Sequence, residues 1–387
     1  MKYLSIIVFS LLVAAAPARA DYRSEYKQYA DAFNAGDIER ALKHGEAAWR
    51  DAETELGDNA TTAILALNFA NVVSPYSPAR ALEAYERALA ITKMGIGSLD
   101  AFELELRTAE TRLTLDIENR DLGVALENLL QAGEQQTSPP TLAMALGWKT
   151  FAIHQSQRRR IEKANDAAEL AIKYASALEP REPRLLAETL VLGATLKLAL
   201  PYRREEDIIQ MVTYVDSSFE LFPPQSSIDT FDPLLARAMQ LRATAGALAA
   251  SDELKPFISR GKDTHLPTGE NLEEAYERAM AHSSVEDQVT WTEGHAPYCR
   301  NSVVWAERKA PSYPRRASQR EYIGAVLIGY DLSETGVARK IILADAEQAG
   351  FGEAAAKSMD EWKLMHAVPP ECRRNLLIIF TFTIKQT

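Results

Sequence analysis

The sequence predicts a multidomain chain, all-α at first and α+β at its end: a long array of paired helices, then a small domain of two strands, a helix and a third strand. Three observations predict it. Residues up to 310 are rich in Ala, Leu and Glu at helical spacing, a small-residue pattern recurs along them, and the remainder changes to an alternating pattern with a glycine turn. With 387 residues, 47% hydrophobic and 25% charged, the chain can bury a large core.

The first 20 residues have the features of a secretory signal peptide. Lys2 precedes a 13-residue apolar run from Leu4 to Ala16, and the segment ends in Ala-Arg-Ala. The run is too short to span a bilayer comfortably. We therefore expect cleavage after Ala20, a mature chain that starts at Asp21, and export from the cytoplasm. The alternative is that the segment is retained as an N-terminal anchor.

The formal net charge of -11 lies before the last part of the chain. Residues 311–387 contain ten Lys or Arg and nine Asp or Glu, and the signal segment carries Lys2 and Arg19, so residues 21–310 hold a net charge of -14. A surface this acidic repels nucleic acid and anionic lipid. We expect no nucleic-acid partner.

A pattern of small or apolar residues at positions i, i+4 and i+7 recurs along the array. Successive copies start 40, 44, 39 and 44 residues apart, and a further segment from Leu272 nearly repeats the second copy. The five copies are Ala41/Gly45/Ala48, Ala81/Tyr85/Ala88, Ala125/Leu129/Ala132, Ala164/Ala168/Ala171 and Ile208/Val212/Val215. They resemble the second helix of a tetratricopeptide repeat (TPR), and Gly36-Asp37 stands where that family turns between helices.

Small residues at this spacing let one helix press closely against the next, so that stacked helix pairs bury a continuous core. We interpret residues 21–284 as a TPR-like α-helical repeat domain, although its period exceeds the usual ~34 residues. Such an array offers a concave surface for a protein or peptide partner and implies no catalytic group.

The C-terminal pattern predicts the order strand, strand, helix, strand. Residues Tyr322 to Leu332 and Val337 to Leu343 read as a hairpin, in which Gly336 supplies a positive φ. Phe351, Ala355, Met359 and Trp362 form one apolar helical face, and Ile378, Phe380, Phe382 and Ile384 alternate on the last strand. Helical periodicity is already lost from Val289, so we place the domain boundary near Ser284. The C-terminal domain is then 285–387, with a lead-in at 285–310 and a core at 311–387.

This domain resembles the C-terminal domain of the TonB energy-transducer superfamily. The resemblance rests on Tyr313-Pro314 with Ala317, on Gly324 and Val326, on Tyr330-Asp331-Leu332, on Gly336-Val337, on Phe351 and the Ala-rich helix to Trp362, on Pro369 or Pro370, and on the closing apolar strand. It covers about the last fifth of the chain.

The resemblance implies that the domain binds an extended segment of an envelope or outer-membrane protein, such as a TonB-dependent receptor, by adding a strand beside its last strand. It places residues 375–385 at the pairing edge. The predicted partner-binding residues are Tyr313, Pro314, Asn375, Leu377, Ile379, Thr381 and Thr383. The alternative is that Tyr313-Pro314 only fixes how the chain enters the first strand, and that the lead-in covers the edge.

The chain departs from a TonB energy transducer because it has a cleavable signal and a helical array in place of a retained anchor and a Pro-rich span. We therefore expect an adaptor or scaffold in the periplasm of a Gram-negative bacterium. The alternatives are an anchored transducer that supports receptor-mediated transport, and a purely structural envelope protein.

Cys299 and Cys372 are the two cysteines, and in an exported chain they predict a disulfide that ties the lead-in to the start of the last strand. The alternative is a metal site in which His295 and His366 join both thiolates. The sequence contains no Gly-x-Ser-x-Gly, phosphate-binding glycine loop or His-Glu-x-x-His motif. We therefore expect no enzyme activity, no cofactor and no metal.

Overall fold

A computed structural model describes residues 21–136, 141–201, 205–249, 285–292, 299–320, 322–346 and 349–383. The chain divides into two compact units, Met1–Leu185 and Leu186–Thr387. The signal segment, the sixth repeat copy, His295 and Ile384 lie outside the described residues.

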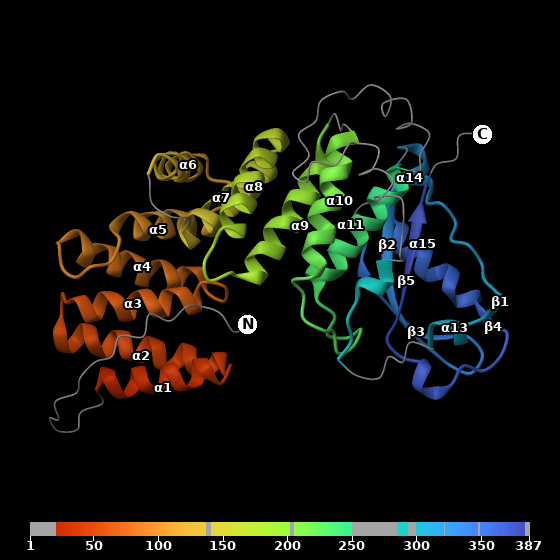
Figure 1. Cartoon of the computed structure of the whole chain (residues 1–387), viewed down its shortest axis with the longest axis horizontal. Helices are drawn as coiled ribbons and strands as arrows, with labels where there is room; N and C mark the ends of the chain where they lie inside the picture. Colours follow the sequence, from red (N-terminus) through yellow and green to blue (C-terminus); the bar gives the residue numbers. More distant parts are fainter. Residues whose placement is uncertain are drawn as a thin grey trace. The chain divides into compact units, whose positions relative to one another are not determined.

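The first unit is a stack of helical hairpins (Figure 1). Each helix packs against the next one along the chain through α5, and α5 packs against both α6 and α7. This packing confirms the predicted TPR-like helical region. Its helices are α1 (Tyr22–Asn34), α2 (Ile38–Leu56), α3 (Ala60–Val73), α4 (Pro78–Lys93), α5 (Ala101–Leu115), α6 (Arg120–Glu134), α7 (Leu142–Gln157) and α8 (Ile161–Ser176).

The turn predicted at Gly36-Asp37 joins α1 to α2. Gly36 has φ +73°, which residues with a Cβ rarely adopt, and the Asp37 side chain accepts a hydrogen bond from the Arg40 amide to cap α2. The two residues together end one helix and start the next.

Four of the five repeat copies lie on buried helix faces, as predicted. They belong to α2, α4 and α8 in the first unit and to α10 in the second. The predicted register of the third copy is wrong. Ala125 and Ala132 are exposed, and the buried positions of α6 are Gly123, Leu126 and Leu130. A Cβ at Gly123 would lie 2.2 Å from Nε2 of buried His154, so α6 requires glycine where it meets α7.

The second unit combines helices with an antiparallel sheet of order β3-β2-β5. Its helices are α9 (Pro183–Ala199), which starts at the end of the first unit, α10 (Glu205–Phe219) and α11 (Pro233–Ala249). The strands are β2 (Gly324–Leu332), β3 (Val337–Ala344) and β5 (Leu376–Phe382), and α15 (Phe351–Ser358) lies between β3 and β5 in the chain. This order of strands and helix is the one the sequence predicts.

Shorter elements complete this unit. They are the 3-10 helices η1 (Val285–Gln288), η2 (Met359–Glu361) and η3 (Pro370–Cys372), the short helices α13 (Cys299–Ser302) and α14 (Arg315–Gln319), and a small two-stranded sheet of β1 (Trp305–Glu307) and β4 (Lys363–Leu364).

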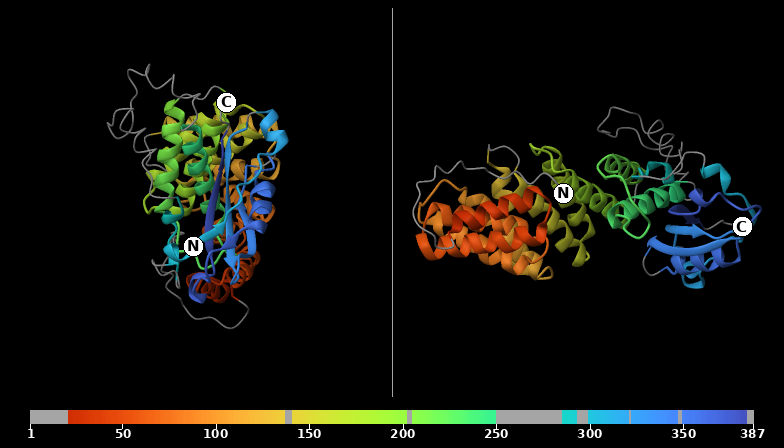
Figure 2. Two further views of the ribbon diagram at one scale, coloured as in Figure 1. Left: turned by 90° about the vertical axis from the view of Figure 1, so that its right-hand side faces the viewer. Right: turned by 90° about the horizontal axis from the view of Figure 1, so that it is seen from below.

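The central strand β2 is covered on both faces (Figures 1 and 2). Val326, Ile328 and Tyr330 belong to a core with Phe351 and Ala355 of α15. On the opposite face, Leu327 packs in a core built by α9, α10 and α11, and Gln240 of α11 donates a hydrogen bond to the Ala325 carbonyl at 3.1 Å. The sheet is therefore the middle layer between two helical layers.

This layering explains why the compact units divide after Leu185 and not near Ser284, where the sequence analysis places the domain boundary. Helices α9, α10 and α11 form one core that includes Leu327 of β2, and α11 packs directly against β2, β3 and β5. They therefore belong to the same unit as the C-terminal domain, which the period of the repeats does not reveal.

Gly336 is required for a different reason from the one predicted. Its φ is not positive; the positive-φ glycines among the described residues are Gly36, Gly57, Gly95, Gly97 and Gly350. The hairpin turn is instead held by the Ser333 hydroxyl, which accepts hydrogen bonds from the Thr335 and Gly336 amides at 3.2 and 3.1 Å. A Cβ on Gly336 would lie 2.5 Å from the Trp362 carbonyl oxygen, so close approach of two backbones demands glycine.

We expect Gly336→Ala to lower the free energy of unfolding by about 1–3 kcal/mol, because the backbone at Trp362 must move to admit the methyl group. Glu334→Ala in the same turn is the control. Its side chain is 79% exposed and makes one 3.7 Å ion pair, so we expect a change below ~0.5 kcal/mol. Urea unfolding of both variants measures the difference; equal stabilities would show that the turn tolerates a Cβ.

Within the described residues, none of the helices combines the length and the apolar character needed to cross a bilayer.

Candidate partner-binding site

The predicted pairing edge is the outer side of β5. Its inner side pairs with β2 from Leu376 to Phe382. On the outer side, the Ile379 amide donates a hydrogen bond at 3.2 Å to the carboxylate of Glu286, which belongs to η1. The 3-10 helix η1 contacts both β5 and α11. The start of the lead-in therefore already uses the middle of this edge, as in the alternative interpretation.

Asn375 is held by the fold at the start of β5. It is one of two non-glycine residues with positive φ among the described residues, at +57°. Its amide donates to the Asp331 carboxylate, and its Oδ1 accepts from the Ile228 amide, both at 3.0 Å. Asn tolerates this conformation better than most residues. The side chain ties the loop between α10 and α11 to the sheet, and this contact explains its position without a partner.

The other predicted residues of β5 fall into two groups. The side chains of Leu377 and Ile379 pack against the core that α11 forms on the sheet, so they contribute to stability. Thr381 and Thr383 are exposed, and Thr383 lies one residue beyond the strand. Among the described residues of β5 and Thr383 that were predicted to bind a partner, the exposed side chains therefore lie at the far end.

Tyr313 and Pro314 lie directly before α14. The Tyr313 ring makes edge-to-face contacts with Phe351 and Phe382, at centroid distances of 5.5 and 5.8 Å, and its hydroxyl donates to the Tyr322 carbonyl. Its ring thus anchors the chain where it approaches β2, which is the role that the alternative interpretation gives it. Burial raises the pKa of the Tyr313 hydroxyl, so it stays a donor.

A surface cavity of about 530 Å³ lies beside Tyr313 and Pro314, between residues 309–316 and α15. Its charged lining is mixed. Lys309 pairs with Glu361 at 2.5 Å, and Arg315, Arg316, Lys357 and Glu353 line the remainder. The Tyr-Pro pair was predicted from the sequence, whereas these charged neighbours were not.

The predicted disulfide is present. Cys299 and Cys372 are joined with their Cα atoms 5.1 Å apart, which links α13 to η3 just before β5. Because both thiols are used, the alternative metal site with two thiolates is wrong. Closing a loop with a sequence separation of 73 residues restricts the unfolded chain and contributes about 4 kcal/mol in the chain-entropy model. Among the described residues, no cluster of His, Cys, Asp or Glu could hold a metal ion.

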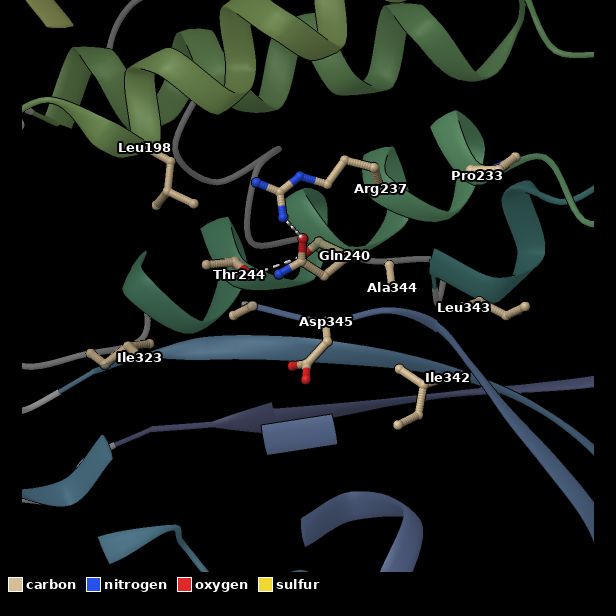
Figure 3. A pocket seen from close by; sticks show the side chains of 11 residues that line it. Leu198, Pro233, Arg237, Gln240, Thr244, Ile323, Ile342, Leu343, Ala344 and Asp345 are labelled. Carbon is tan, nitrogen blue, oxygen red and sulfur yellow. Dashed lines mark hydrogen bonds between the residues drawn. The ribbon is translucent and has the colours of Figure 1, made fainter. Parts of the chain in front are cut away.

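The opposite edge of the sheet was not singled out by the sequence analysis. There β3 leaves β2 after Ala344, at an irregularity in the pairing near Leu327. A cavity of about 700 Å³ opens beside this point, lined by Leu198, Pro233, Arg237, Gln240, Thr244, Ile323 and residues 342–346 (Figure 3). The signal that could have located it is Ile341-Ile342-Leu343, an apolar run that gives an edge strand apolar side chains on both faces.

One set of buried polar groups in the helical array is paired internally. Arg107 of α5 donates to the Tyr85 hydroxyl at 2.6 Å and to the Glu110 carboxylate at 3.0 Å, and Glu110 also accepts from Thr150 of α7 at 2.9 Å. Arg107 and Glu110 are 6% and 8% exposed. A buried ion pair with these hydrogen bonds holds α4, α5 and α7 in register, so we interpret it as structural.

We expect Asn375→Ala to destabilise the second unit more than Asn375→Gly does. Both variants remove the acceptor of the Ile228 amide, but only Ala also strains a backbone at positive φ, which adds about 1 kcal/mol. Urea unfolding of the full chain measures both. Equal losses would contradict the strain argument, and no loss in either variant would remove the structural role of Asn375.

No family model matches the chain, and no curated protein matches it. Among solved structures, the chain is similar to a tetratricopeptide repeat protein from Parabacteroides merdae ATCC 43184, with 16% sequence identity and a TM-score of 0.24, over 67% of this chain and 99% of that chain.

Proposed function

We propose that this protein is a non-enzymatic, protein-binding adaptor of the bacterial periplasm. The helical array binds one partner, and the C-terminal sheet, which resembles the TonB C-terminal domain, binds an extended segment of a second, envelope partner by strand addition. The observation that carries the proposal is the ββαβ sheet of order β3-β2-β5, in which two strands are edges. An edge strand has main-chain donors and acceptors that a partner strand can use.

The charge distribution supports a protein partner. The part before residue 311 is strongly acidic, which disfavours nucleic acid and anionic membrane surfaces. Because η1 contacts the outer side of β5 at Ile379, a strand that adds there has to displace the Glu286 carboxylate or pair beyond it, near Thr381. Binding at this edge thus competes with a contact inside the chain.

Peptide selection tests the binding mode. We expect a phage-displayed library of random twelve-residue peptides, selected against the full chain, to give binders of about micromolar Kd. Amide hydrogen exchange with the best synthetic peptide should show slower exchange at an edge of the sheet. A scrambled peptide is the control. If no peptide is selected, or if protection is confined to the helices of residues 21–185, strand addition is wrong for this protein.

Intact mass tests the proposed location. Protein recovered from the periplasm of a Gram-negative host should have the mass of residues 21–387, and alkylation should add to it only after reduction, because Cys299 and Cys372 are joined. Retention of residues 1–20 in a membrane fraction would contradict the periplasmic adaptor and favour the anchored transducer.

A further inference from the structure

The pairing register shows which main-chain groups of the sheet face outward. The Ile379 amide bonds Glu286 and therefore points away from β2. Ile379 pairs with Leu327 of β2. In such an antiparallel pair both residues direct their main-chain groups away from each other, so the N–H and C=O groups of Leu327 point toward β3. Those of Gly329, two residues along the strand, point the same way. Gly329 pairs with Ile341. The amides of Lys340 and Ile342, one residue to either side, consequently point away from the sheet on the outer edge of β3.

The two ends of the β3 edge differ. Near its start, Gly336 forms a bridge to Lys363, the Leu364 amide donates to the Thr335 carbonyl at 2.9 Å, and Lys340 pairs with Asp360. From Ile341 to Ala344, no described residue forms a strand pair on the outer side. Ile342 is 45% exposed there, which is high for an isoleucine in a sheet.

The cavity beside this edge follows from where β3 stops. Because β3 leaves the sheet after Ala344, the Ala325 carbonyl has no strand partner on this side and accepts a hydrogen bond from Gln240 instead, at 3.1 Å. The cavity lies beside β2, where β3 no longer pairs with it. It is bounded by α11, the end of α9 at Leu198, and residues Leu343 and Ile323 (Figure 3). It continues directly from the outer edge of β3.

Among the described residues that line this cavity, Arg237 carries a positive charge on the α11 side. The Arg237 guanidinium donates to Gln240 Oε1 at 2.6 Å, and Gln240 is itself fixed to β2, so the charge has a defined position (Figure 3). The Asp345 carboxylate lies at the other side of the strand end and accepts the Gly352 amide at 3.0 Å. A chain laid along β3 would therefore meet apolar side chains and a positive charge on its α11 side.

We propose that an extended segment of a partner protein adds to the outer edge of β3 at residues 341–344, with an apolar side chain in the cavity and an acidic residue beside Arg237. This assignment rests on the proposed function, according to which the sheet binds a partner strand. It places that strand beside β3 instead of β5. Main-chain hydrogen bonds supply affinity, and the cavity and the charge supply selectivity.

Two proline variants of the full chain test the assignment with the selected synthetic peptide. Ile342→Pro removes an outward amide from the β3 edge, and Thr381→Pro removes the equivalent outward amide from β5; proline is tolerated where the lost N–H faces solvent. We expect Ile342→Pro to weaken binding about ten-fold or more, through the lost hydrogen bond and the ring, and Thr381→Pro to leave it unchanged. Circular dichroism and thermal unfolding verify that both variants are folded.

A change of side-chain charge gives a second test of the β3 assignment, and it does not alter the main-chain donors. Arg237→Met keeps most of the side-chain length and removes the charge. The control is Arg316→Met, because Arg316 is exposed and lies beside α15, on the other side of the sheet. We expect the first to weaken binding of an acidic selected peptide by about ten-fold, and the second by less than about two-fold.

The outcomes separate the two proposals. If Thr381→Pro weakens peptide binding and Ile342→Pro does not, the β3 assignment is wrong and strand addition at β5 remains. Equal binding by both folded proline variants overturns strand addition itself. A photo-crosslinker at position 342 that couples to residues 250–284 of its own chain, or to a second copy, also overturns a partner-protein occupant.

Discussion

Burial of both faces of β2 is the constraint on which the second unit depends. Val326 and Ile328 pack under α15, while Leu327 faces the helices that end the repeat array. A small sheet needs a hydrophobic face, or packing against a helix, for independent stability. Here α11 closes one face, Gln240 of α11 donates a hydrogen bond to β2, and the Asn375 side chain binds the loop between α10 and α11. The last helices are thus part of the sheet domain.

This constraint also decides what the sheet can offer to a partner. Because both faces are covered, a partner strand can reach the sheet at its edges. The two edges differ in the contacts that they already make within the chain. Glu286 satisfies the Ile379 amide on β5, and the disulfide between Cys299 and Cys372 ties the lead-in close to the start of that strand. On β3 the second half of the strand runs beside a cavity that contains Arg237. The same layering that stabilises the sheet therefore leaves the second half of β3 as the edge at which we propose that a partner strand adds.

Much of this architecture could be predicted from the sequence because it depends on local patterns. Small residues at i, i+4 and i+7 located the buried faces of α2, α4 and α8, and alternation with a turn located the hairpin. The role of Gly336 was missed because its constraint is the Trp362 carbonyl, 26 residues away in sequence. The division of the compact units after Leu185, and not near Ser284, has a similar origin. The continuous apolar run Ala325-Val326-Leu327-Ile328 indicates a strand buried on both faces, but it does not say which helices cover it.

Native-state hydrogen exchange of the full chain, followed by NMR or mass spectrometry through low denaturant concentrations, tests the central claim most directly. If α11 and the sheet are one unit, amides in the middle of α11 and of β2 should exchange through the same cooperative opening, with equal free energies and equal dependence on denaturant. The account is contradicted if α11 amides exchange through a lower-energy opening while β2 and α15 stay protected, because the sheet would then be stable without its helical cover.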